Sequence, residues 1–301
     1  MLPANVDPHD YQAKPQDIQR LADADVLVEN GLGLESFLED LVANAENDDL
    51  LVIDSSQDLP VLEMPESDGH KEAGHGEDAH AHGDAEHDEE GHEDHREEGH
   101  EDHEDEAHDE EGHDEEAHSE HAHDHSEGDP HVWLDPKKAI GQVENIRDGL
   151  IAADPEGEAV YTANAAAFID ELRSLDQSIT ETLAPYAGQT FVTFHDFAGH
   201  FADSYDLEMV YLVELPEGNA APADMQRVID VAKESELKTL LSEPQQSEGA
   251  FDAIAADLGI QVSVFDPIET TDEATSEPGD YIESMEQNLA NLTTAFGAAT
   301  P

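Results

Sequence analysis

Residues 66–129 interrupt the chain with a 64-residue segment that has almost no side chain able to build a core. The segment holds 15 of the 19 histidines, 29 acidic residues, two basic residues and no aromatic residue. It can bury too little apolar surface to offset the entropy lost on ordering, so we expect it to be disordered. The fold must therefore be built from the residues on either side of it.

The acidity is not confined to this segment. The chain carries 76 acidic and 11 basic residues, a formal charge of −65, of which −27 lies in residues 66–129 and −38 in the remainder. Such a surface repels phosphate backbones and anionic headgroups, so nucleic-acid and membrane-surface binding are excluded. Either it is an ordinary solvated acidic surface or, as we favour, it reflects a halophilic habitat in which salt screens like-charge repulsion.

Outside this segment, strand-like and helix-like patterns alternate. Before it, the pattern predicts helices over 15–22 and 34–45 and strands over 25–29 and 50–53. After it, we expect strands over 190–193, 208–212, 239–241 and 261–264, and helices over 136–152, 155–184, 197–204, 223–234, 248–257 and 278–296. This alternation predicts an α/β fold with mostly parallel sheets.

The helix expected after Pro155 is unusually long. At close to 30 residues it would extend about 45 Å, which indicates a connection between two lobes. We therefore expect an N-terminal lobe over 1–153, a long connecting helix over 154–186, a C-terminal lobe over 187–301, and a cleft between the lobes.

Three of the four histidines outside the segment share a local sequence setting. His9 and His131 each follow Asp-Pro, while His195 follows the apolar strand 191–194. Asp266 likewise follows a predicted strand, and open α/β sheets bind ligands at the carboxyl ends of their strands. Three imidazoles and a carboxylate make a tetrahedral zinc set, the alternative being that each is an ordinary loop residue. His200 lies about 140° from His195 on a helix, so we expect it on the surface or behind the ligands.

The chain resembles the zinc-uptake substrate-binding proteins of ABC transporters, in which these motifs occur in the same order. They belong to a wider family that also binds manganese. The matching stretches cover nearly the whole chain except the histidine-rich segment: DPHDYQAKPQDIQRLADADVLVENGLGLESFLEDL (7–41), DPHVWLDPKKA (129–139), FVTFHDFAGHFADSYDL (191–207), LLSEPQQS (240–247) and VFDPI (264–268). A histidine-rich acidic loop between the first two ligands is itself typical of the zinc branch.

The resemblance implies that His9, His131 and His195 are metal ligands and that Asp266 occupies the fourth position, where water or a nearby carboxylate can stand instead. Histidine at position 195 favours zinc, since manganese prefers oxygen ligands. Glu243 is expected to shape the cleft rather than bind the metal. The resemblance further implies two α/β lobes with little hinge bending and a monomer outside the cytoplasm that serves a permease and its ATPase. It implies no enzymatic activity.

Residues 1–9 contain no recognisable leader. The chain is therefore cytoplasmic or begins downstream of its natural start. The family carries a secretory leader and a further strand–helix unit before the first ligand, so we expect a truncated start.

The histidine-rich segment offers many weak imidazole and carboxylate sites for zinc, and we expect it to capture or buffer this ion. The alternative is a solubilising tract in which histidine is incidental. Three other functions stay open for the whole chain: a manganese or other divalent-metal lipoprotein of the same family, a zinc hydrolase and a metal-storage protein. The sequence shows no HExxH motif, nucleophile elbow or phosphate-binding glycine loop, which disfavours the hydrolase.

Overall fold

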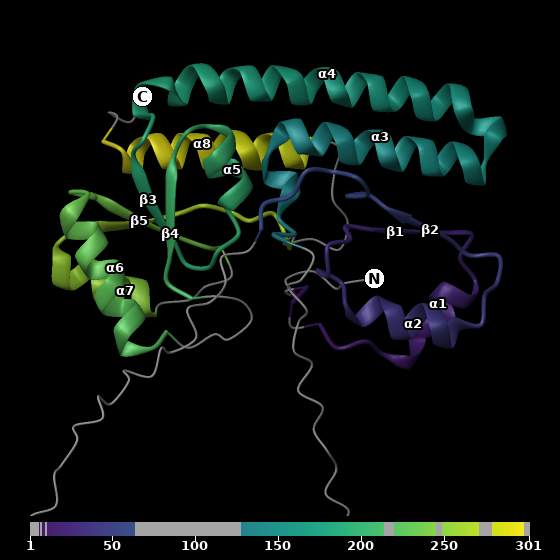
Figure 1. Cartoon of the computed structure of the whole chain (residues 1–301), viewed down its shortest axis with the longest axis horizontal. Helices are drawn as coiled ribbons and strands as arrows, with labels where there is room; N and C mark the ends of the chain where they lie inside the picture. The colour runs from purple at the N-terminus through teal and green to yellow at the C-terminus, as the bar shows by residue number, and fades with distance from the viewer. Residues whose placement is uncertain are drawn as a thin grey trace, which may run out of the picture. The chain divides into compact units, whose positions relative to one another are not determined.

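The computed structural model describes residues 6, 8–9, 11–63, 128–213, 220–244, 249–270 and 279–297. All of them belong to one compact unit (Figure 1). The predicted disordered segment lies almost entirely outside the described residues. Its last two residues are described, however, and the backbone N of Asp129 donates to the carbonyl of Leu62 at 2.9 Å. Residues 128 and 129 of the predicted segment therefore lie within the described fold.

The first lobe contains a parallel pair of strands, β1 (Val26–Glu29) and β2 (Leu51–Asp54), with Val26 opposite Leu51. Helices α1 (Pro15–Ala22) and α2 (Phe37–Ala45) pack together through a small core of Leu21, Leu38, Leu41 and Ala45. The helix predicted over 34–45 begins later because Gly31, Leu32 and Gly33 have positive φ angles, which turn the chain before α2.

Two long helices follow the segment. The Asp135 carboxylate caps α3 (Pro136–Ala153) by accepting from the backbone N of Lys137. A short 3₁₀ turn, η3 (Pro155–Gly157), then leads into the 26-residue α4 (Glu158–Leu183). Figure 1 shows α4 running beside α3 over its first part and near α8 (Asp280–Ala295) at its other end, in agreement with the contacts between these helices.

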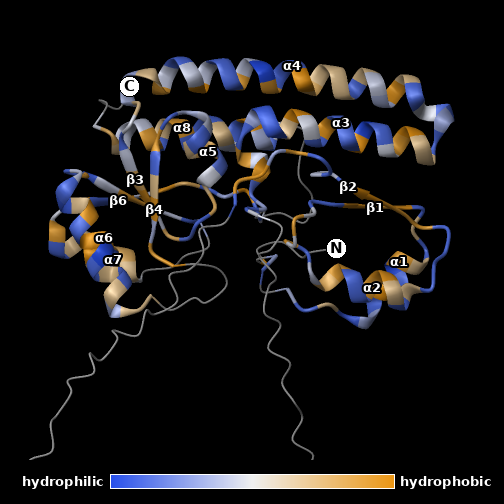
Figure 2. Cartoon of the chain, in the orientation of Figure 1, coloured by the Kyte–Doolittle hydropathy of each residue, from blue (hydrophilic) through white to orange (hydrophobic). Residues whose placement is uncertain are grey.

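The second lobe is built on a four-stranded parallel sheet with the order β4-β3-β5-β6. Its strands are β3 (Thr190–Thr193), β4 (Glu208–Tyr211), β5 (Thr239–Ser242) and β6 (Gln261–Val264). Its other helices are α5 (Gly199–Ser204), α6 (Pro222–Glu234) and α7 (Ala250–Leu258). Figure 2 shows apolar residues concentrated in the strands, as expected for parallel sheets covered by helices.

Two cores lie on this sheet. One gathers residues of α4 and α8 around a cluster of phenylalanines that includes Phe191, Phe197, Phe201 and Phe265. The other packs α6 and α7 against Val192 and Leu240. The predicted α/β class, with two lobes and a long helix, is confirmed, whereas the domain boundaries at 153/154 and 186/187 remain a prediction.

Among the helices that the structure describes, none combines the length and the apolar character needed to cross a membrane.

Candidate metal centre

His131 stands at the start of a 3₁₀ turn, η2 (Val132–Leu134), between the histidine-rich segment and α3. Its side chain is 1% exposed. Asp129 Oδ1 lies 2.8 Å from the ring Nδ1 of His131 and accepts from its backbone N at 2.9 Å. The carboxylate therefore holds Nδ1 and leaves Nε2 on the opposite side of the ring.

His195 is held in the same way at the carboxyl end of β3. Glu243, which follows β5, places Oε1 2.5 Å from the Nδ1 of His195 and accepts from its backbone N at 3.2 Å. Both side chains are almost fully buried. Neighbouring parallel strands thus bring a histidine and its carboxylate together, and the predicted structural role of Glu243 agrees with this contact.

Glu269 completes the group. It lies in the loop after β6, and its side chain is 0% exposed. Its Oε1 lies 3.1 Å from Nε2 of His131, 3.5 Å from Nε2 of His195 and 3.6 Å from Nε2 of His9. One ligand atom from each of the four residues lies within 4.8 Å of every other.

These spacings match a tetrahedral zinc ion. With metal–ligand bonds of about 2.0–2.1 Å, the edges of a tetrahedron are about 3.3–3.4 Å. The three distances from Glu269 Oε1, 3.1, 3.5 and 3.6 Å, lie on either side of this value. Nε2 of His131, Nε2 of His195 and both oxygens of Glu269 are buried and make no hydrogen bond of good geometry among the described residues. Buried polar atoms that converge in this way are expected of a cation site.

The titration of these groups reflects their close packing. Burial alone would lower the pKa of His131, but the carboxylates of Asp129 and Glu269 raise it to about 10. Burial opposes the charged form of His195 too, yet Glu243 and Glu269 raise its pKa to about 9. Burial would raise the pKa of Glu269, and the facing histidines instead hold it well below its usual range. Without metal, the centre therefore holds protons where a dication would bind.

The structure does not bring Asp266, the predicted occupant of the fourth position, into this group, and the carboxylate that faces the histidines is the nearby Glu269. Its Oδ1 accepts from the backbone N of Ile268 at 2.8 Å. This contact closes a turn, and Ile268 within it has a φ of 58°. The turn carries the chain onward so that Glu269, rather than Asp266, faces the histidines. The pattern of strand ends identified the loop after β6. It could not show whether Asp266 or Glu269 faces the histidines, because this depends on the left-handed conformation of Ile268.

His200 is wholly buried, so of its two predicted positions, on the surface or behind the ligands, the structure shows the second. Its Nε2 lies 3.0 Å from the carbonyl of Asp129, the residue that holds His131. Asp196 is also buried beside His195, and burial raises the pKa of its carboxyl. The sequence-based prediction assigned no role to Asp129 or Asp196. Their position directly beside the candidate histidines was the available signal.

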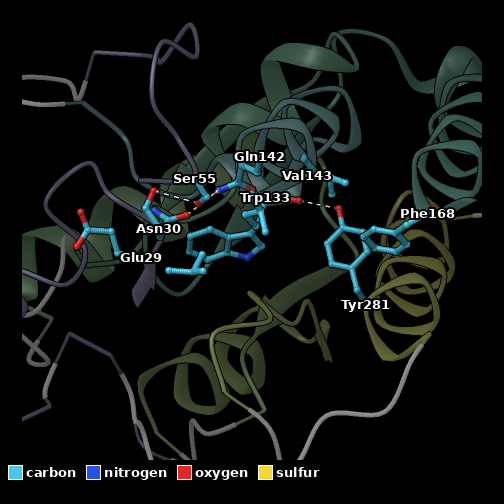
Figure 3. A pocket seen from close by; sticks show the side chains of 11 residues that line it. Glu29, Asn30, Ser55, Trp133, Gln142, Val143, Phe168 and Tyr281 are labelled. Carbon is cyan, nitrogen blue, oxygen red and sulfur yellow. Dashed lines mark hydrogen bonds between the residues drawn. The ribbon is translucent and has the colours of Figure 1, made fainter. Parts of the chain in front are cut away.

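A cavity of about 310 Å³ lies next to the centre. Trp133 lines the cavity (Figure 3). Its ring centroid is 5.3 Å from that of His131. The polar side chains at one end of the cavity already bond to one another, with Gln142 Nε2 donating to Asn30 Oδ1 and Ser55 Oγ. None of the four converging residues lines this cavity.

Comparisons with known proteins show the family of the chain. The sequence profile of the family described as zinc-uptake complex component A, periplasmic (ZnuA) matches residues 1–295. The chain is 26% identical to the manganese-binding lipoprotein MntA of Halalkalibacterium halodurans over 292 residues, 96% of this chain and 77% of that protein. It is 34% identical to the zinc-binding lipoprotein AdcA of Streptococcus pneumoniae over 170 residues, 56% of this chain.

The similarity extends to solved structures. A crystal structure of ZnuA superposes with a TM-score of 0.70 at 26% identity, covering 98% of this chain and 88% of that one. The matched region spans only 34% of AdcA.

Proposed function

Because the chain belongs to the periplasmic ZnuA family of zinc-uptake components, we propose that it binds Zn²⁺ outside the cytoplasm and delivers it to an ABC importer. This family consists of metal-binding transport components rather than enzymes. In the proposal, His9, His131, His195 and Glu269 bind the ion, which is cargo. A permease and its ATPase are the partners, and the binding protein acts as a monomer held at the cell surface.

The observation that carries this proposal is the convergence of three buried imidazole nitrogens on one carboxylate oxygen at 3.1–3.6 Å. Four protein ligands at these spacings suit zinc. Because these ligands would take all four positions of a tetrahedral ion, none is left for the water that a hydrolytic zinc ion needs. The centre therefore favours holding an ion over reacting with one.

Manganese is the second candidate, because one of the similar proteins is named a manganese-binding lipoprotein. The donor set argues for zinc. Manganese prefers six oxygen ligands, whereas this centre offers three nitrogens and one carboxylate.

The histidine-rich segment is proposed to capture or buffer zinc beside the centre. Its support comes from composition, 15 histidines and a net charge of −27, and from where its flanks lie. The backbone N of Asp129 bonds to Leu62, and the Asp129 side chain contacts His131. Ions held by the segment would therefore be kept at a raised local concentration by a chain that rejoins the fold beside His131.

The test is metal titration of the purified chain, of His131→Ala, and of a chain lacking residues 66–127. We expect one tight zinc site together with weaker ones in the full chain. His131→Ala should lose the tight site and keep the weaker ones, and the deletion should do the reverse. A tight site that survives His131→Ala contradicts the proposed centre, and unchanged stoichiometry after the deletion contradicts the buffering role.

A further inference from the structure

The turn that carries Glu269 is under backbone strain. Ile268 has a φ of 58°, a left-handed conformation that β-branched residues rarely adopt. The Asp266 carboxylate stabilises this turn through the backbone N of Ile268. Strain of this kind persists only where the surroundings hold it in place, and it is common at functional sites.

Asn288 holds the turn from the side of α8. It is 1% exposed, and its side chain makes a two-way contact with the backbone of Asp266. The Asp266 N donates to Asn288 Oδ1 at 2.8 Å, and Asn288 Nδ2 donates to the Asp266 carbonyl at 2.7 Å. The start of the turn is therefore fixed to a long helix.

Trp133 holds the turn from the other side. Its indole Nε1 donates to the carbonyl of Pro267 at 2.8 Å, across 134 residues of sequence. Its own carbonyl accepts from the Tyr281 hydroxyl at 2.6 Å, a contact drawn in Figure 3. Since Trp133 is two residues after His131, one side chain ties the segment of one ligand to the turn of another.

We propose that Trp133 and Asn288 are positioning residues that fix Glu269 and thereby set the preference of the centre for zinc over manganese. The inference rests on the proposed function. A fixed Glu269 offers one oxygen at a tetrahedral corner, as zinc requires. A loosened turn lets both carboxylate oxygens approach the ion, which favours an ion that takes more oxygen ligands.

Two variants loosen the turn by different routes. Trp133→Phe removes the N–H donor and keeps an aromatic ring, whereas Asn288→Ala removes both contacts with the backbone of Asp266. Asn145→Ala is the matched control. Asn145 Nδ2 also holds two loop carbonyls, those of Ser55 and Gln57, both at 2.9 Å, but in the first lobe.

Zinc and manganese affinities of the full chain are measured by chelator competition, and the visible spectrum of the Co²⁺-loaded protein reports coordination. Loss of an outer contact of this kind typically costs about 10–100-fold in metal affinity. We expect Trp133→Phe and Asn288→Ala to lower the zinc-to-manganese affinity ratio at least about tenfold and to weaken the tetrahedral Co²⁺ bands. Asn145→Ala should leave both readouts unchanged.

If both metals weaken equally, or neither changes, in variants that remain folded, the positioning role is overturned while the zinc-binding function stands. If the unaltered chain has no tight zinc site, the proposed function itself fails. If Trp133→Phe does not fold, Asn288→Ala still tests the proposal, because it removes a different contact with the same turn.

Discussion

Asp129 Oδ1 contacts both the ring Nδ1 of His131, at 2.8 Å, and its backbone N, at 2.9 Å. A single oxygen thus fixes the ring and the main chain of the same residue. Gly199, the first residue of α5, leaves room for the Asp129 carboxylate. A Cβ at this position would come within 2.7 Å of the other oxygen of Asp129. The orientation of His131 is therefore set by residues from both lobes.

Asp129→Asn should weaken zinc binding by about 10–100-fold, because the amide holds the ring less strongly and makes its Nε2 less basic. Chelator competition at fixed pH measures the effect. Asp170→Asn, which removes a carboxylate that is 78% exposed on α4, controls for the change in net charge and should bind zinc as the original chain does. Equal affinities in all three proteins would contradict the orienting role.

Glu269→Gln should lower zinc affinity by about 100-fold or more, because the replacement removes the only charged ligand of the proposed four. Asp266→Asn keeps an oxygen that can accept from Ile268 and should change the affinity little. Isothermal calorimetry distinguishes the two residues. The opposite ranking would restore Asp266 as the ligand.

Zinc binding should release protons near neutral pH. The pKa values of about 10 for His131 and about 9 for His195 keep both rings protonated in the metal-free protein at pH 7. Zinc requires their neutral forms, so affinity should rise with pH up to about 9–10. Calorimetry in buffers of different ionisation enthalpy counts the protons, and we expect about two per zinc. A count of zero would contradict the raised pKa values.

The metal-free protein should lose stability as the pH rises from 7 to 10. A histidine whose pKa is raised on folding stabilises the fold fully below its unfolded pKa of about 6.5, and that contribution disappears as the pH passes the folded value. For His131 and His195 the loss therefore extends from about pH 6.5 to the folded pKa values of about 10 and about 9. Thermal unfolding across this range measures it. The zinc-loaded protein is the control and should be less sensitive, since bound metal replaces the protons.

The fold should gain stability with added salt, because a formal charge of −65 produces strong self-repulsion that ions screen. Thermal unfolding in about 0.1 M and about 2 M KCl provides the comparison, with sucrose of equal osmolality as the uncharged control. A melting temperature that rises equally in both solutes, or not at all with KCl, would contradict adaptation to high salt.

Local patterns predicted most of the helices and strands. Pro15, Pro136 and the apolar strands are strong local signals, and α1, β3 and β6 have the predicted bounds. The three histidines could also be selected, because motifs beside strand ends converge in a parallel fold. Glu269 could not be selected, since its direction depends on the φ of Ile268 and on the distant Trp133 and Asn288. The burial of His200 likewise depends on Asp129, 71 residues away.

Trp133 is the single tryptophan of the chain, and its ring lies 5.3 Å from the imidazole of His131. All indole fluorescence therefore originates beside the metal centre. A charged imidazolium quenches a neighbouring indole more strongly than a neutral ring does, so exchanging protons for metal should brighten the emission. The fluorescence of Trp133 should therefore report metal binding at the proposed centre without an added label.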